Sequence, residues 1–301
     1  MNRSQLKRPL GMGVPNRGAH SLKFFAAIPL LPLFVYMGVF FFFPLSAVFR
    51  ESLRDNLGHW SLVNFAAIVQ NPYRLAFINS VKLGLISALT AALPGAIFAY
   101  IIETRGSEKL KRLVSSLAGV IANTGGVPLA FMFIATFGAE GSTTLVLKRM
   151  GWDLYSGDFT LFSFTGIVIT YLYFQIPLMI IVFSPAVHGL RKEWREASQS
   201  LGATPLQFWR KIGVPLLFPS FAASFLLLFA GGFAAYATAR AMTVGNVALV
   251  PLQIGNLIDG NVQINQMNVG KSLAVGMIII SALAMIPYFI IQARTRKWQG
   301  N

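Results

Sequence analysis

The sequence predicts an all-α integral membrane protein with six transmembrane helices and both termini in the cytoplasm. Two observations on composition support this class: 55% of the 301 residues are hydrophobic and only 12% are charged. Soluble domains carry about twice that share of charge. The third observation is that six apolar runs reach the roughly 20 residues that a helix needs to cross the hydrocarbon core. Backbone in lipid must satisfy its own hydrogen bonds, so we expect these runs to be helices.

The predicted spans follow the apolar runs in chain order, and within them only Lys82 is charged. They cover residues 24–49, 75–102, 113–138, 161–187, 216–239 and 272–293. The first run is too long for the apolar core of a signal peptide and follows a polar segment, so we interpret it as a retained transmembrane helix. The spans form one transmembrane domain over 24–293, between a tail at 1–23 and a tail at 294–301.

Basic residues indicate the orientation of the spans. The tails and the loops at 103–112 and 188–215 carry 17 of the 25 Lys and Arg residues. The loops on the other side, at 50–74, 139–160 and 240–271, carry seven. Cytoplasmic loops of membrane proteins are enriched in Lys and Arg, which places both tails and the 188–215 loop in the cytoplasm.

The same rule gives a source for the net charge of +15, which in a soluble protein would suggest nucleic acid. We therefore expect no nucleic acid partner. The chain has no Cys, and its three His residues lie far apart in sequence, so no metal site is predicted. No Ser–His–Asp set or pair of carboxylates indicates an enzyme.

The third predicted span contains the segment "NTGGVP" at 123–128. It places the amide of Asn123 and the hydroxyl of Thr124 beside two Gly and a Pro, where polar groups are costly if they face lipid. Irregular backbone of this kind lines pathways in transporters. Lys82 either reaches the outer headgroups or faces the pathway and contacts an anion. Further candidates for the pathway are Gln175, Tyr236 and Thr238.

The loop at 188–215 is a charged segment between two of the longest apolar runs. Within it Trp194, Ala197 and Leu201 recur at spacings of three and four, which predicts one face of a short helix. Charged and polar residues occupy much of the remaining surface of that helix.

Residues that are typical of a turn follow this predicted helix. Gly202 supplies the left-handed or close-approach geometry that ends a helix. Thr204 and Pro205 are typical of an N-cap and a first helical position, so we expect a second short helix through Phe208 and Trp209. The prediction is a helix–turn–helix elbow, and its exposed apolar residues among charges suggest a docking surface for a soluble protein.

The elbow carries a motif. The pattern Glu-Ala-Ala, three residues, Gly, nine residues, Ile, one residue, Leu-Pro resembles the EAA loop of membrane subunits of binding-protein-dependent ABC importers. Ser198 and Val214 replace the second Ala and the Leu. The matching positions are Glu196, Ala197, Gly202, Ile212 and Pro215. The segment at 60–81 and the C-terminal part of the chain are also similar to this family, nearest to its polyamine, opine and phosphonate branch.

The resemblance implies the type I ABC importer permease fold in a bacterial plasma (inner) membrane. Within that fold the loop would be a coupling helix that docks in a cleft of an ATP-hydrolysing subunit. Ala197 and Gly202 would let the two surfaces approach closely, and Glu196 would be an anionic partner for the cleft. The docking residues carried over by the motif are Glu196, Ala197, Ser198, Gly202, Ala203, Pro205, Ile212 and Pro215.

The resemblance also implies partners and a role. The chain would be a transport subunit without covalent chemistry, and it would form the path of a small solute such as a polyamine, an opine or a phosphonate. Two ATPase subunits would bind ATP and Mg²⁺, and the chain itself would hold no cofactor. A second permease subunit of different sequence, an extracytoplasmic solute-binding protein and membrane lipid would complete the set.

One further motif suggests an ATP site in the chain itself, but the motif is incomplete. "VGKSLAVG" at 269–276 contains the Gly-Lys-Ser end of a phosphate-binding loop, but Asn265 stands where that loop needs Gly. We interpret Lys271 as an interfacial anchor. The alternative function is an ion-coupled carrier or channel, a class that usually carries ionisable residues inside its spans. Lys82 is the one such residue here.

Overall fold

The computed structural model describes residues 30–55, 57–157, 159–243, 245–259 and 266–299, with side chains up to residue 290. The predicted tail at 1–23 and the first six residues of the first predicted span lie outside these ranges. The chain divides into two compact units, Met1–Arg50 and Glu51–Asn301.

The described part of the first unit is helical. α2 (Leu31–Met37) runs into a π-helical turn η2 (Gly38–Phe42) and then into α3 (Phe43–Ser52), which enters the second unit. This segment is free of charge as far as Phe49, which suits a helix in lipid.

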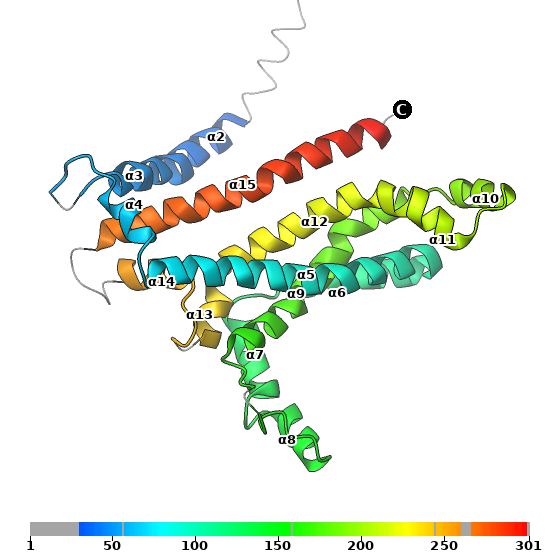
Figure 1. Cartoon of the computed structure of the whole chain (residues 1–301), viewed down its shortest axis with the longest axis horizontal. Helices are drawn as coiled ribbons and strands as arrows, with labels where there is room; N and C mark the ends of the chain where they lie inside the picture. The colour runs from blue at the N-terminus through cyan, green and yellow to red at the C-terminus, as the bar shows by residue number, and fades with distance from the viewer. Residues whose placement is uncertain (1–29, 56, 158, 244, 260–265, 300–301) are drawn as a thin grey trace, which may run out of the picture. The chain divides into compact units, whose positions relative to one another are not determined.

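The second unit is built from helices, and the described residues contain no β-strand. Three long ones form its centre: α5 (Tyr73–Arg105), α9 (Phe164–His188) and α12 (Val214–Ala234). α5 packs against both α9 and α12, while α15 (Met267–Gln299) packs on α12 and α6 (Glu108–Asn123) packs on α9 (Figure 1).

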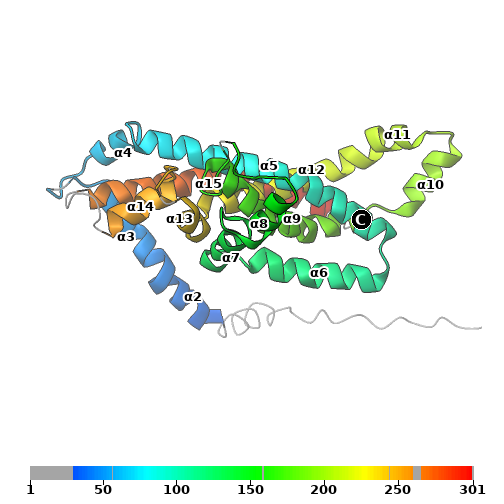
Figure 2. The same ribbon diagram turned by 90° about the horizontal axis from the view of Figure 1, so that it is seen from below.

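Shorter helices gather at the two ends of this centre. One end holds α4 (Val63–Ile68), α13 (Ala237–Thr243) and α14 (Val250–Ile258). α10 (Lys192–Ser200) and α11 (Pro205–Phe208) lie at the other end, as Figures 1 and 2 both show. α7 (Val127–Phe137) and α8 (Ser142–Arg149) connect α6 to α9.

Small residues form the buried face of α5. The buried positions recur at helical spacing, and seven of the ten are Ala or Gly: Ala76, Ser80, Leu83, Gly84, Ser87, Ala88, Ala91, Ala92, Gly95 and Ala99. A methyl group at Gly95 would stand 2.6 Å from Met179 of α9, and one at Gly84 would stand 3.0 Å from Phe229 of α12. Small residues let helix backbones approach in membranes, where no hydrophobic force drives helices together.

Within the residues that the structure describes, six helical segments are long and apolar enough to cross a membrane, which confirms the predicted number. They are Leu31–Ser52, Tyr73–Arg105, Val127–Arg149, Phe164–His188, Pro205–Ala234 and Met267–Ile290.

The third segment differs from the sequence prediction of one span over 113–138. α6 ends at Asn123, and α7 begins at Val127 after Gly126, which has φ +80° and ψ −152°. L side chains rarely adopt that backbone conformation, and Pro128 lacks a donor, so one helix cannot run through this point. The fifth segment likewise ends at Ala234, before the predicted residue 239, because the backbone is extended at Ala235.

Candidate functional site

The elbow predicted at 188–215 is present, and its first turn is a Schellman motif. α10 ends at Ser200, and Gly202 takes φ +77°. The amide of Gly202 donates to the carbonyl of Gln199 at 2.9 Å, and the amide of Ala203 donates to that of Ser198 at 3.0 Å. These bonds satisfy carbonyls that the end of α10 leaves free. The predicted left-handed role of Gly202 is confirmed.

The second helix of the elbow begins with a capping box. The hydroxyl of Thr204 accepts from the amide of Gln207 at 3.3 Å, and the side chain of Gln207 accepts from the amide of Thr204 at 2.8 Å. Pro205 occupies the first helical turn, where its missing donor costs nothing. The predicted N-cap at Thr204 is therefore confirmed.

Continuous helix joins the elbow to α12. α11 runs into a π-helical segment η3 (Trp209–Gly213), and α12 follows without a break. The ring of Trp209 meets that of Tyr100 of α5 edge to face, with centroids 4.9 Å apart. Phe208 is buried. The elbow is thus fixed both to the end of α5 and to the start of α12.

The two faces of α10 differ. Trp194, Ala197 and Leu201 share one face because a helix turns about 100° per residue. All three are exposed, and Leu201 is 88% exposed. This is the apolar face that the sequence predicts.

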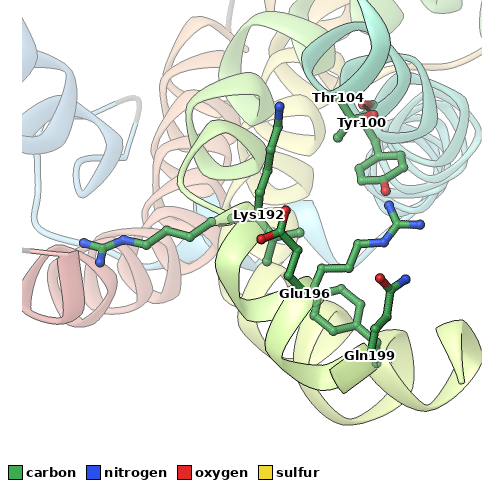
Figure 3. A pocket seen from close by; sticks show the side chains of 9 residues that line it. Tyr100, Thr104, Lys192, Glu196 and Gln199 are labelled. Atoms are coloured by element: carbon green, nitrogen blue, oxygen red, sulfur yellow. Dashed lines mark hydrogen bonds between the residues drawn. The ribbon is translucent and has the colours of Figure 1, made fainter. Parts of the chain in front are cut away.

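The opposite face of α10 is polar and borders a cavity of about 310 Å³ between α10 and α5. Tyr100 and Thr104 of α5 lie on the far side of the cavity, and Tyr100 and Gln199 point toward each other across it (Figure 3). The residues that line the cavity are Tyr100, Thr104, Leu190, Arg191, Lys192, Arg195, Glu196, Gln199 and Phe208.

The other residues of the motif lie along the elbow. Ser198 is buried with 8% of its surface exposed, so a small side chain at this position fits the turn. Ala203 is half-buried, whereas Pro205, Ile212 and Pro215 are exposed. Most of the predicted docking residues therefore form a surface that another protein can reach.

Three helices meet beside the elbow through a cluster of charges. Glu103 of α5 is 13% exposed, and its carboxylate lies 3.6 Å from Nδ1 of His188 and 3.7 Å from Nζ of Lys111. Lys111 also bonds Glu108 at 3.1 Å, which lowers the pKa of the Glu108 carboxyl and raises the pKa of the Lys111 ammonium. The cluster links the ends of α5, α6 and α9.

Three of the predicted pathway residues, Thr124, Tyr236 and Thr238, lie at the junction of two helix breaks. The amide of Gly126, between α6 and α7, donates to the hydroxyl of Thr238 at 2.9 Å, close after the break between α12 and α13. Thr124 belongs to the first break, and Tyr236, which is 40% exposed, belongs to the second. Asn123 and Thr124 bond carbonyls of their own helix at 2.8 and 2.7 Å.

Gln175 and Lys82 lie away from this junction. The amide of Gln175 is fully buried and donates to Oγ of Ser87 and to the carbonyl of Leu228, both at 3.3 Å. In this conformation Gln175 thus contacts α5 and α12 and does not face open space. Lys82 is exposed on α5.

Sequence reasoning did not single out several polar contacts near these residues. Oγ of Ser80 accepts from the amide of Val250 at 2.9 Å, and Nη1 of Arg240 donates to Asn256 at 2.7 Å. Lys271, expected to be an interfacial anchor, pairs with Glu51 and bonds Asn268. Lone Ser and Asn residues carry no helical spacing signal, so only the fold reveals their partners. Among the described residues, no group of three His, Asp or Glu side chains could hold a metal ion.

Comparison with known proteins gives a family. Residues 21–298 match the protein family described as "Binding-protein-dependent transport system inner membrane component". Over 196 residues the chain is 28% identical to the putative 2-aminoethylphosphonate transport system permease protein PhnU of Salmonella typhimurium, covering 64% of this chain and 66% of PhnU. It thus spans just under two thirds of that relative's length.

Two further proteins are similar over most of the chain. The trehalose transport system permease protein SugB of Mycobacterium tuberculosis is 26% identical over 283 residues, which are 92% of this chain and 95% of SugB. A chain in the crystal structure of a bacterial ABC transporter involved in the import of the acidic polysaccharide alginate has the same fold. It gives a TM-score of 0.68 at 15% identity and covers 93% of this chain and 97% of that one.

Proposed function

The chain belongs to the family of inner membrane components of binding-protein-dependent transport systems, and from this we propose that it is the permease subunit of an ATP-driven importer. Its place is the inner membrane, which it crosses several times. The observation that carries the proposal is the elbow between the fourth and fifth candidate spans, with Trp194, Ala197 and Leu201 exposed on one face of α10. Exposed apolar residues among charges are typical of docking surfaces.

In this proposal the ATPase subunits move the elbow when they bind ATP. Two ATPase subunits bind ATP and Mg²⁺. One docks on α10 and around Gly202 of this chain, and the other docks on the corresponding elbow of a second, different permease chain. The helix from α11 through η3 into α12 is unbroken, so movement of the elbow is passed along the roughly 30 Å of α12. α12 ends at the break beside Tyr236, where α13 begins and Thr238 bonds Gly126.

We place the gate of the pathway at that junction. Two interrupted helices meet there, and irregular backbone within a membrane protein is tolerated where it is buried in protein or lines a cavity. The energy available to move the gate is limited to the difference in ATP affinity between the two states of the transporter. An extracytoplasmic binding protein delivers the solute to the opposite end from the elbow.

The solute class follows from the predicted spans, which contain no carboxylate. A polyamine crossing a low-dielectric path needs anionic partners, so the spans of this chain favour a phosphonate or an opine over a polyamine. The phosphonate-system relative agrees with this choice. Uptake of labelled 2-aminoethylphosphonate against labelled spermidine, in cells that express the complete transporter, tests it.

Gly202 allows a sharp test of the docking role. Asn tolerates the left-handed backbone that Gly202 adopts at φ +77°, and no atom lies within 4 Å of a Cβ at this position. Gly202→Asn should therefore keep the elbow folded while adding a side chain where the ATPase approaches. We expect weaker co-purification of the ATPase and at least a tenfold loss of uptake, and Gly202→Asp should lose both.

Gly151 provides the matched control. It has φ +88°, and a Cβ there would also meet no atom within 4 Å. It follows α8, far in sequence from the elbow, so Gly151→Asn should leave ATPase binding and uptake unchanged. Normal uptake in Gly202→Asn cells would refute the docking role. Solute uptake by the purified chain alone, in liposomes without nucleotide, would instead favour an ion-coupled carrier or channel.

A further inference from the structure

We propose that the cavity between α10 and α5 binds the phosphate-bearing headgroup of an anionic phospholipid. The cavity, of about 310 Å³, is lined by residues of both helices and lies at the end of α5 that carries the elbow (Figure 3). The proposal rests on the proposed function only for its consequence, the bracing of the docking helix.

Charge is the first argument. Three basic residues, Arg191, Lys192 and Arg195, line the cavity, against the single carboxylate of Glu196. The guanidinium of Arg191 lies over the ring of Trp194, 6.0 Å from the ring centroid, so Lys192 and Arg195 are the two cations offered to a ligand. Among the described residues, no carboxylate lies within 4 Å of the charged ends of these three cations. Basic pockets between transmembrane helices on the cytoplasmic side bind lipid headgroups. Guanidinium groups also bind phosphate oxygens in pairs of parallel hydrogen bonds.

Neutral donors complete the lining. The phenol of Tyr100 and the amide of Gln199 face each other across the cavity and can donate to phosphate oxygens (Figure 3). The ring of Tyr100 is held edge to face by Trp209, so the phenol is fixed in place. Glu196 can accept from the hydroxyl groups of a glycerol headgroup.

A route for the hydrocarbon chain is the second, independent argument, and it separates a lipid from a free phosphate. Tyr100 and Thr104 lie on the same stripe of α5 as Leu93 and Ile97, because spacings of four, seven and eleven residues return to one side of a helix. Leu93 is 54% exposed and Ile97 is 59% exposed. An exposed apolar stripe thus leads along the candidate span directly to the polar cavity. A ligand with a phosphate head and an acyl tail fits both parts.

The consequence concerns the docking face. The cavity borders the side of α10 opposite Trp194, Ala197 and Leu201. A headgroup in the cavity therefore supports α10 from behind when an ATPase presses on its exposed face.

The test measures lipid retention by the purified full-length chain, without ATPase or solute, so its result does not depend on the proposed function. The chain in mild detergent is mixed with phosphatidylglycerol or phosphatidylcholine, and retained lipid is counted by native mass spectrometry. The variant Lys192→Gln with Arg195→Gln removes two cations from the cavity. The matched control, Arg210→Gln with Lys211→Gln, removes two exposed cations of the elbow that do not line it.

The wild-type chain and the control should retain phosphatidylglycerol, and the cavity variant should bind it roughly 30-fold more weakly, as expected for two cations near a lipid surface. Glu196→Gln should strengthen binding. Thermal unfolding of each variant checks that the fold persists. Equal retention by the two double variants would overturn the proposal, as would equal retention of phosphatidylcholine. Displacement of the lipid by millimolar inorganic phosphate would assign the site to free phosphate.

Discussion

The amide of Gly126 donates a 2.9 Å hydrogen bond to the hydroxyl of Thr238, and this bond joins two helix breaks that are 112 residues apart. The same hydroxyl lies 3.3 Å from the carbonyl of Gly126 and donates to it. One side chain therefore satisfies the amide of Gly126, which no helix bond satisfies, and adds a second partner to the carbonyl of Gly126, which also accepts from the amide of Ala130 in α7 at 3.3 Å. Thr238 is 3% exposed, so water cannot readily replace it.

Thr238→Val keeps the shape of the side chain and removes both bonds. We expect the free energy of unfolding to fall by about 1–3 kcal/mol, because the amide of Gly126 is left without a hydrogen-bond partner. The measurement is the thermal unfolding midpoint in detergent, together with solute uptake in cells. Thr136→Val is the control, since the hydroxyl of Thr136 only bonds Met132 of its own helix at 2.7 Å. Equal effects of the two changes would contradict a special role of Thr238.

Neighbouring glycines in α12 should differ sharply. A methyl group at Gly232 would stand 2.7 Å from Nε2 of Gln175 and 3.0 Å from Oγ of Ser87, whereas one at Gly231 would meet no atom within 4 Å. Gly232→Ala should therefore cost about 1–3 kcal/mol through overpacking. Gly231→Ala should be neutral or slightly stabilising, because Ala favours helix. The thermal unfolding midpoints of the two variants, measured side by side, check this pair.

The two exposed or half-buried tryptophans of the elbow should give different defects. Trp194 belongs to the docking face, so Trp194→Ala should weaken ATPase co-purification. Trp209 instead pairs with Tyr100, a contact worth about 0.5–1.5 kcal/mol beyond its buried area. Trp209→Ala should leave the ATPase bound and active but uncouple hydrolysis from uptake. The ratio of solute moved to ATP hydrolysed, measured in proteoliposomes, distinguishes the two; the same ratio in both variants would refute this division of roles.

Lys82→Met should leave uptake kinetics unchanged. Lys82 is exposed on α5 beside Leu85 and Ile86, which are each 43% exposed, and this surface suits lipid with the ammonium reaching the headgroups. The measurement is the KM and maximal rate of uptake in cells. A raised KM for an anionic solute would show that Lys82 contacts the solute, which is the alternative reading of the sequence.

Asp153 should make the turn after α8 sensitive to acid. The amide of Tyr155 at 3.0 Å and then the ammonium of Lys148 at 3.3 Å hold the pKa of the Asp153 carboxyl below its usual range. Because the pKa of Asp153 is lower in the folded chain, its carboxylate stabilises the turn fully above the pKa of Asp in the unfolded chain, about 4. This stabilisation is lost as the pH falls through the lower pKa of the folded chain.

Hydrogen exchange of residues 150–157 should therefore be slow and constant from pH 7 to pH 5 after correction for intrinsic rates, and should rise in stronger acid. Asp153→Asn should show, at every pH, the faster exchange that the wild-type chain shows only in strong acid. Glu140→Gln, a change at an exposed carboxylate before α8, is the control. Identical profiles for wild type and Asp153→Asn would show that the carboxylate does not hold the turn.

The sequence predicted the number of spans and the elbow because both leave local signals. Hydrophobic runs define the spans, and Gly202, Thr204 and Pro205 mark the turn by residue type alone. It did not predict that the 113–138 segment divides into two helices, although "NTGGVP" was recognised as irregular. Apolar residues of α6 and α7 lie on both sides of this short segment and give one hydrophobic run, so hydropathy alone cannot detect that the helix is interrupted.

The candidate pathway was predicted less well for a related reason. Thr238 and Thr124 do lie at one junction, but Gln175 is buried between α5, α9 and α12. A polar side chain within a span is unfavourable if it faces lipid, so the sequence predicts that it faces protein or a pathway. Sequence alone does not distinguish a pathway from a neighbouring helix. Its partners Ser87 and Leu228 are 88 and 53 residues away in sequence, beyond any local pattern.

The small-residue face of α5 has a mechanical consequence. Between Gly84 and Gly95 the buried positions of α5 are Gly, Ser and Ala, so the long side chains at this contact come from α9 and α12, as Met179 at Gly95 and Phe229 at Gly84 show. Shear between packed helices is a common mode of domain movement, and α5 adds no long side chain of its own to this contact. We therefore expect that α12 can shift along α5 by small steps while the two helices stay in contact.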